Sequence, residues 1–329
     1  MSDNTPGAQH HDVICIGNAI MDVLGAVEET FLVDHAVEKG GMNLIDEARA
    51  DYLTTALEQS EMLAGGSAAN TAYGIAKLGS KCGFVGQVKK DVIGDDFISD
   101  IEAGGVSYLG TQPETGPATA CSIILVTPDT ARSMNTFLGS TLHLSDAHLG
   151  DELSANIIYL EGYLFDAPAG EAIFKRVVEV AQNCGAKLAL SLSDSWCVER
   201  HFDAMRSFVR DHADIIFSNE EEFAALMGGT SDEQITELLT EVDEVIITCG
   251  SKGANCYSKT EHAFAAAQPI GEVVDTTGAG DLFAAGYLYA RTNNMSLQAR
   301  ADIASRCAGE VICHFGARPN EDLTSIIAA

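Results

Sequence analysis

The order of apolar and polar residues in the second half of the chain follows a regular rhythm. Short apolar runs, typical of buried strands, alternate with longer segments in which apolar residues recur at helical spacing. The predicted strands cover 157–160, 187–192, 214–217 and 244–248, and the predicted helices cover 168–183, 200–210 and 220–227. This alternation predicts a parallel sheet with right-handed crossovers and flanking helices.

The first half begins and continues in the same way. Residues 12–17 form an apolar run closed by glycine, which predicts a buried first strand. A strand at 82–86 is followed by a helix at 94–103. Near the end of the chain, 297–314 predicts a long closing helix.

Two segments depart from the rhythm. Residues 106–140 alternate strand-forming runs with turns that contain glycine and proline, and residues 22–44 mix short apolar pieces with glycines. We interpret 22–44 and 106–140 as inserted segments that form a small β-sheet lid. The rest of the chain then forms one α/β domain, spanning 1–329 with its insertions.

Composition narrows the classes of partner. The chain of 329 residues is 46% hydrophobic and carries 48 acidic against 19 basic residues, a formal net charge of −29. So acidic a protein lacks the basic face that nucleic acid and anionic membranes require, and neither is an expected partner. Any polyphosphate must be held by main-chain dipoles, a metal ion and a few placed basic residues.

The nine cysteines and the start of the chain indicate a cytoplasmic protein. The cysteines are scattered, odd in number and without a Cys-x-x-Cys pair, which favours free thiols in a reducing compartment. Residues 1–11 contain no signal-peptide core, and no apolar run is long enough to span a membrane. We expect the polar start, including His10 and His11, to be disordered.

Residues 275–281, Asp-Thr-Thr-Gly-Ala-Gly-Asp, are the strongest candidate for chemistry. A glycine turn before an apolar helix presents free amides and the positive end of the helix dipole, which together bind phosphate. If an alcohol lies beside that phosphate, Asp281 takes its proton and the amides of Gly278, Ala279 and Gly280 hold the developing charge. The alternative is a glycine turn with Asp281 as a helix cap.

Polar residues near the first strand and the first glycine turn are candidates for substrate binding. Asp22 follows the first strand, where open α/β sheets bind ligands, and could accept a pair of hydroxyls; the alternative is a turn-forming residue. Gly65-Gly66 opens a small-residue helix at 71–78, and Asn70 projects from its start toward a hydroxylated ligand. The alternative is that the two glycines serve packing alone.

Further features suit a nucleotide and its metal ion. Asn219 and Glu222 follow a predicted strand and suit an outer shell for Mg²⁺ waters, with an Asn-capped helix as the alternative. The glycine turn at 248–253 lies between two predicted strands, where its amides or Lys252 could contact phosphates or ribose. Arg132 is either a solvated side chain or one of the few cations placed for phosphate.

Other nucleotide-binding motifs are missing from the sequence. There is no Walker A motif, no G-x-G-x-x-G after the first strand, and no protein-kinase H-R-D or D-F-G motif. The motifs that are present lie in order along nearly the whole chain. They are Gly65-Gly66 with Asn70, the N-x-x-E element at 219–222, and D-T-x-G-A-G-D at 275–281.

With these motifs the chain resembles the ribokinase-like (PfkB-type) family of sugar and nucleoside kinases. Within that family, Gly17-Asn18 with Asp22, and Arg132 in the lid, resemble the adenosine kinase subgroup. The resemblance implies a doubly wound, mostly parallel sheet flanked by helices, with the small β lid closing over the substrate. Such closure excludes water that would otherwise be phosphorylated.

The resemblance also implies a role for each motif residue. For catalysis it implies Asp281 as base, with Gly278, Ala279 and Gly280 as the anion hole. For the acceptor it implies Asn18, Asp22, Gly66 and Asn70, beside which Phe137 and Tyr163 are candidate walls for a base or else core residues. For ATP it implies Arg132, Asn219, Thr248, Gly250, Gly253 and Gly309. For metals it implies Mg²⁺ at Asn219 and Glu222, and a monovalent cation such as K⁺ at Asp275 and Thr277. At Gly309, animal adenosine kinases have an asparagine, so adenine contacts differ there.

The function expected is ATP-dependent transfer of the γ-phosphoryl group to the 5′-hydroxyl of a ribonucleoside, with adenosine as the leading acceptor. The alternative is a sugar kinase for ribose or fructose, in which Glu161 could bind a sugar hydroxyl. A non-catalytic ligand sensor is a third reading, and the intact Asp281 argues against it. Monomer and homodimer are equally compatible with the sequence.

Overall fold

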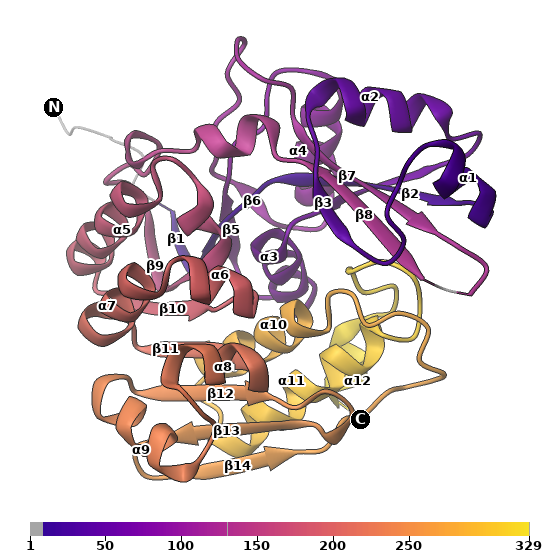
Figure 1. Ribbon diagram of the computed structural model, residues 1–329. Helices are drawn as coiled ribbons and strands as arrows, with labels where there is room; N and C mark the ends of the chain where they lie inside the picture. Colours follow the sequence, from indigo (N-terminus) through magenta and orange to yellow (C-terminus); the bar gives the residue numbers. More distant parts are fainter. Residues whose placement is uncertain (1–8, 130, 329) are drawn as a thin grey trace, which may run out of the picture.

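The computed structural model describes residues 9–129 and 131–328, and it is built around a large twisted β-sheet and a smaller second sheet (Figure 1). The strand order of the large sheet is β14-β13-β12-β11-β10-β9-β1-β5-β6. These strands are β1 (His10–Ile16), β5 (Cys82–Val85), β6 (Ser107–Tyr108), β9 (Ser154–Glu161), β10 (Lys187–Ser191), β11 (Ile215–Asn219), β12 (Glu244–Thr248), β13 (Ala254–Ser258) and β14 (His262–Ala265).

The large sheet is parallel from β6 to β12, as the sequence predicts, and only β13 and β14 at one edge run antiparallel. Side chains along each strand alternate between two core clusters. In β1, Val13 and Cys15 pack on one face while Ile14 and Ile16 pack on the other. The doubly wound fold is therefore confirmed.

Helices cover both faces of this sheet. On one face lie α3 (Ser67–Lys77), α4 (Val92–Ala103), α10 (Ala279–Thr292), α11 (Leu297–Val311) and α12 (Leu323–Ala328). On the other lie α5 (Gly170–Cys184), α6 (Ser195–Arg200), α7 (Phe202–His212), α8 (Glu220–Met227) and α9 (Asp232–Glu241). Short 3₁₀ turns are η1 (Gly139–His143), η2 (Asp146–His148), η3 (Gly162–Asp166) and η4 (Gly250–Lys252). No helix in the described ranges is long and apolar enough to cross a bilayer.

The second sheet has the strand order β3-β8-β7-β2-β4 and carries α1 (Glu29–Asp34) and α2 (Glu47–Ala56) beside it (Figure 1). Its strands are β2 (Ile20–Ala26), β3 (Met42–Leu44), β4 (Glu61–Gly65), β7 (Ala120–Val126) and β8 (Arg132–Phe137). The predicted segments 22–44 and 106–140 thus need two corrections. The second sheet also contains β4, which pairs with β2, whereas β6, inside 106–140, pairs with β5 of the large sheet.

The prediction of a disordered start is wrong for His10 and His11. Both lie in β1 and pair with Ser154 and Ala155 of β9. The His10 ring also bonds to the Ser154 hydroxyl at 2.9 Å, and only 3% of His11 is exposed. The polar residues at the start of β1 suggested disorder, but backbone hydrogen bonds to β9, rather than apolar side chains, extend the strand over them. The nine cysteines are all free thiols, as predicted.

Candidate active site

The start of α10 is a glycine turn with a left-handed residue. Gly278, at the N-cap, has φ 78°, and a Cβ there would lie 2.7 Å from the Cα of Ala317. Both the backbone conformation and the approach of that loop therefore exclude a side chain. No side chain caps α10, so amides of its first turn, such as that of Gly280, face outward toward an incoming anion. The amide of Ala279 instead donates to Thr276 within the turn at 3.2 Å.

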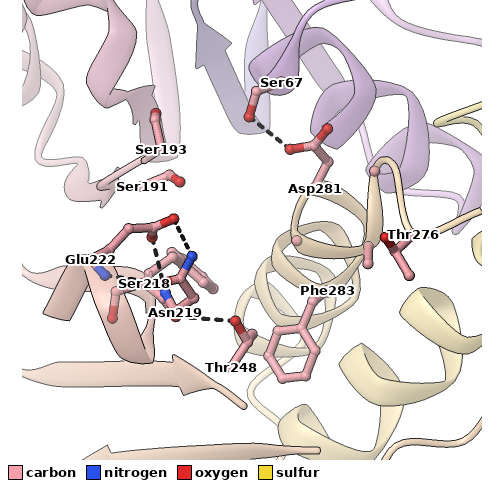
Figure 2. A pocket seen from close by; sticks show the side chains of 14 residues that line it. Ser67, Ser191, Ser193, Ser218, Asn219, Glu222, Thr248, Thr276, Asp281 and Phe283 are labelled. Atoms are coloured by element: carbon pink, nitrogen blue, oxygen red, sulfur yellow. Dashed lines mark hydrogen bonds between the residues drawn. The ribbon is translucent and has the colours of Figure 1, made fainter. Parts of the chain in front are cut away.

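The Asp281 carboxylate lies in the first turn of α10 and is held from α3. The Ser67 hydroxyl donates to its Oδ1 at 2.7 Å (Figure 2). The Asn70 side-chain amide donates to its Oδ2 at 3.0 Å. The Thr71 hydroxyl donates to the Asp281 carbonyl at 3.2 Å. These contacts fix the carboxylate on the wall of a cavity rather than in solvent or in the core.

Burial raises the pKa of Asp281 above its ordinary value, and the hydrogen bonds from Ser67 and Asn70 partly oppose that rise. A carboxylate in this environment is a stronger base than one in water, yet it remains accessible to a ligand in the cavity. The site therefore has the property that a general base needs.

Two cavities meet at the turn that begins α10. The first, about 290 Å³, lies between Asp281 and the strand ends of β10 and β11, and the second, about 450 Å³, lies between β12 and α11. The residues that line both are Thr248, Thr276, Ala279, Gly280 and Phe283. An elongated ligand can thus extend from the second cavity, past the anion-binding turn, to Asp281.

Asn219 and Glu222 face the first cavity from the start of α8 (Figure 2). They form a capping box: Asn219 accepts from the Glu222 amide at 2.8 Å, and Glu222 accepts from the Asn219 amide at 2.9 Å and from its side chain at 2.6 Å. Burial raises the pKa of Glu222 to about 7. Asn219 and Glu222 therefore cap the start of α8 and also line the first cavity. The remaining oxygen lone pairs suit hydrogen bonds from Mg²⁺-bound waters better than direct coordination.

The second cavity contains the glycines predicted to border a nucleotide. Gly250, Gly253 and Gly309 line it together with Thr248. A Cβ on Gly309 would lie 2.5 Å from the carbonyl carbon of Gln268, so the loop after β14 fills the space that an asparagine would need. Lys252, by contrast, points into solvent, with 75% of its side chain exposed.

The pair Asp275 and Thr277, predicted to hold a monovalent cation, is bonded to Arg132 instead. The Arg132 guanidinium forms an ion pair with Asp275 and donates to the Thr277 hydroxyl at 2.8 Å. Asp275 also accepts from the amides of Thr277 and Gly316, at 3.0 and 3.1 Å. These residues do not fit a K⁺ site in this arrangement, because a guanidinium already satisfies the carboxylate.

The predicted acceptor residues gather on the side of Asp281 that faces the second sheet. Gly66, with φ 97°, occupies the N-cap position of α3, and a Cβ there would overlap the carbonyl oxygen of Asn18. Asn70 contacts Asp281 directly. Asp22 lies on β2, and burial raises its pKa to about 7, with Arg318 and Arg132 opposing the rise and Asp281 adding to it. Asn18, Asp22, Gly66 and Asn70 thus come from separate segments to one region.

The two predicted wall residues, Phe137 and Tyr163, are partly buried against the core. Phe137 packs against one core cluster, and Tyr163, in η3, packs against the cluster on the opposite face of the large sheet. Neither lines the two cavities. The predicted acceptor residues Asn18, Asp22, Gly66 and Asn70 do not line these cavities either, so the role of Phe137 and Tyr163 as walls for a base stays a prediction.

Several site residues escape sequence reasoning. Ser67 holds Asp281, and Ser191, Phe217 and Phe283 line the first cavity, together with Ser193, Ser218 and Thr276 of the segments that carry the family resemblance. In the structure Ser193 has an unusual backbone conformation, with a φ of 72° in a residue other than glycine. Its hydroxyl accepts a hydrogen bond from the Gly162 amide at 2.8 Å. Single serines at strand ends are too common to stand out in a sequence.

A buried carboxylate beside a helix start with outward-facing amides, together with connected cavities for a long ligand, is the arrangement expected of a kinase that phosphorylates an alcohol. The pfkB family of carbohydrate kinases matches residues 10–323, and the chain belongs to that family. It is therefore a phosphotransferase with an alcohol acceptor, and the family implies the use of ATP.

Related proteins extend the comparison. A probable sugar kinase from Rhizobium etli CFN 42 is 37% identical with a TM-score of 0.87, covering 96% of this chain and 97% of its own. The adenosine kinase from Sinorhizobium meliloti is 35% identical with a TM-score of 0.86, covering 96% and 98%. A 5-dehydro-2-deoxygluconokinase from Lacticaseibacillus casei is 29% identical over 283 residues, covering 80% of this chain and 86% of its own length.

Proposed function

We propose that the protein transfers the γ-phosphoryl group of ATP to the 5′-hydroxyl of a ribonucleoside, with adenosine as the acceptor. The observation that carries this proposal is the position of Asp281. Its carboxylate is held by Ser67 and Asn70 and faces a cavity that continues past the first turn of α10.

In this mechanism the acceptor hydroxyl donates a hydrogen bond to Asp281. The carboxylate takes the proton as the hydroxyl oxygen bonds to the γ-phosphorus, and the bond from that phosphorus to the β,γ-bridging oxygen breaks to release ADP. The outward-facing amide of Gly280 and the positive end of the α10 dipole hold the charge on the transferring group. Asp22 and Asn70 orient the ribose hydroxyls.

The second cavity takes the adenine and ribose of ATP, and its triphosphate extends toward the start of α10. Asn219 and Glu222 would hold a Mg²⁺ ion through its waters, and the ion would supply positive charge to the phosphates. Arg132 adds a cation beside the same turn, and the second sheet acts as a lid that excludes water from the acceptor.

The choice of adenosine rests on the 35% identity to the Sinorhizobium meliloti adenosine kinase over 96% of the chain. The alternative, a sugar kinase, is supported by the 37% identity to the probable sugar kinase from Rhizobium etli and by the similarity to 5-dehydro-2-deoxygluconokinases. One argument for a sugar is weakened: both carboxylate oxygens of Glu161 accept backbone amides, so Glu161 is not free to bind a sugar hydroxyl.

The test is a phosphorylation assay with ATP and a panel of adenosine, ribose, fructose and 5-dehydro-2-deoxygluconate. We expect the highest kcat/KM with adenosine. Asp281→Asn should lower kcat by about 10² to 10⁴-fold and leave adenosine binding, measured by calorimetry, within a few-fold. Turnover of a sugar without turnover of adenosine would favour the alternative acceptor, and full turnover by Asp281→Asn would remove the assigned base.

A further inference from the structure

Glu161 is a fully buried carboxylate that the mechanism above does not use. It ends β9, the strand next to β1 in the middle of the large sheet, and none of its surface is exposed. A carboxylate so placed is costly unless its oxygens are hydrogen-bonded. Burial raises its pKa to about 7, and hydrogen bonds from the Ala68 and Asn18 amides oppose that rise.

The two oxygens of Glu161 join two separate segments of the acceptor region. Oε1 accepts the backbone amide of Asn18 at 2.8 Å, and Oε2 accepts the backbone amide of Ala68 at 2.8 Å. Asn18 lies between β1 and β2, where the chain leaves the large sheet for the second one. Ala68 lies in the first turn of α3.

α3 needs this contact because it does not cap itself. Its N-cap residue is Gly66, which has no side chain to accept an orphan amide of the first turn. Glu161 supplies that acceptor from another strand and places negative charge at the positive end of the helix dipole. Ser67 and Asn70, which flank this position in the first turn of α3, are the residues that hold Asp281.

The surrounding chain is shaped around this carboxylate. A Cβ on Gly17 would lie 2.6 Å from the Glu161 carboxyl carbon, so glycine is required for the approach. On the other side of the turn, the Thr141 hydroxyl donates to the Asn18 side chain at 3.1 Å and accepts from the Ala19 amide at 3.2 Å. The turn between β1 and β2 is thus fixed from two sides.

We propose that Glu161 is a positioning residue for the phosphoryl-transfer reaction: by accepting the Asn18 and Ala68 amides, it sets the start of α3 and so the acceptor-binding groups around Asp281. It contacts neither ATP nor the reacting atoms in this scheme. The inference rests on the proposed place of the acceptor, and it predicts that losing Glu161 impairs use of the acceptor while use of ATP persists.

The test is steady-state kinetics of Glu161→Gln, with whichever acceptor of the panel the wild type phosphorylates. Glutamine has the same shape, but it replaces one accepting oxygen with a donor, so one amide loses its partner. A displacement of about 1 Å at a substrate-positioning group lowers catalysis about 10²-fold. We expect kcat/KM for the acceptor to fall 10- to 100-fold, while the KM for ATP stays within twofold.

Two further variants complete the design. Glu161→Asp keeps the charge but is one methylene shorter, so it should give an intermediate loss for the acceptor; it also provides the test if Glu161→Gln does not fold. Asp214→Asn is the matched control, because its carboxylate accepts the Leu188 amide at 2.8 Å but lies at the opposite end of the strands. It should leave both substrates' kinetics unchanged.

Equal changes in the KM of ATP and acceptor for both Glu161 variants, or kinetics like those of Asp214→Asn, would overturn the proposal. Because the acceptor is chosen by wild-type turnover, this result is distinct from failure of the adenosine assignment. If adenosine is not phosphorylated but a sugar is, the selective loss is still expected with that sugar.

Discussion

The guanidinium of Arg132 forms an ion pair with Asp275, joining the second sheet to the loop that leads into α10. The two side chains are 15% and 4% exposed. Arg132 also donates to Thr277 and lies over the ring of Phe315, 5.6 Å from its centre. The sheet proposed as a lid and the loop that leads into α10 are therefore in direct contact through one arginine.

Arg132→Ala should destabilise the protein and slow catalysis. Removing one partner of a buried ion pair leaves the other charge uncompensated, which costs about 3 kcal/mol of unfolding free energy. The cost is measured by urea unfolding at neutral pH. Lys39→Ala, which removes exposed ion pairs with Glu29 and Asp129, is the control and should have a smaller effect. Equal effects of the two changes would contradict a structural role for the Arg132 pair.

Ser67→Ala should move the acid limb of the pH–activity profile upward. The Ser67 hydroxyl lowers the pKa of Asp281 by bonding to its ionised form, so its loss raises that pKa further. Because a general base must be ionised, activity is then lost at a higher pH as pH falls. The measurement is kcat/KM for the acceptor against pH, with Ser207→Ala on the surface of α7 as control. An unmoved or lowered limb would argue against Asp281 as the base.

Asp22→Asn should stabilise the protein at high pH and impair function. Burial raises the pKa of Asp22 to about 7, above the value of an unfolded chain, near 4. Between those values the folded state retains a proton that the unfolded state has lost, so the contribution of Asp22 to stability falls as pH rises.

Asparagine removes this penalty, so the gain in unfolding free energy should be larger at pH 8 than at pH 5, by on the order of 2 kcal/mol. Urea unfolding at both pH values measures it, and Asp203→Asn on the exposed side of α7 should show no such difference. The same Asp22 variant should bind the acceptor more weakly. A gain independent of pH would contradict the raised pKa.

Gly309→Ala should weaken ATP use and stability together. The added Cβ would press on the Gln268 carbonyl group at the wall of the second cavity, and such overpacking costs about 1–3 kcal/mol. We expect the KM for ATP to rise while the KM for the acceptor is unchanged. Gly229→Ala is the control, because its Cβ would meet atoms no closer than 3.4 Å. A normal KM for ATP in Gly309→Ala would place the nucleotide elsewhere.

Elements with strong local patterns were predictable. The strands β10 and β12 and the helix α8 lie where apolar periodicity and glycine turns place them, because their buried faces are continuous in the sequence. The glycine turn at 278–280 was predictable because two glycines just before an apolar helical run indicate a tight turn, and Gly278 indeed has a φ of 78° beside the Ala317 backbone. Strands at the edges of the two sheets were not predictable. The side chains of β4 are only partly buried, and β6 is held mainly by pairing with β5, so neither strand has a clear apolar pattern.

Local sequence by itself determined the parallel α/β core, the glycine turn at 278–280 and the presence of a carboxylate in the first turn of α10. Tertiary structure alone decided which side chains reach that carboxylate, because Ser67 and Asn70 come from a helix more than two hundred residues away in sequence. It also decided that Arg132 pairs with Asp275 and that Glu161 accepts two distant amides. Hydrogen bonds and ion pairs depend on atoms within a few ångströms, and only the folded chain brings those atoms together.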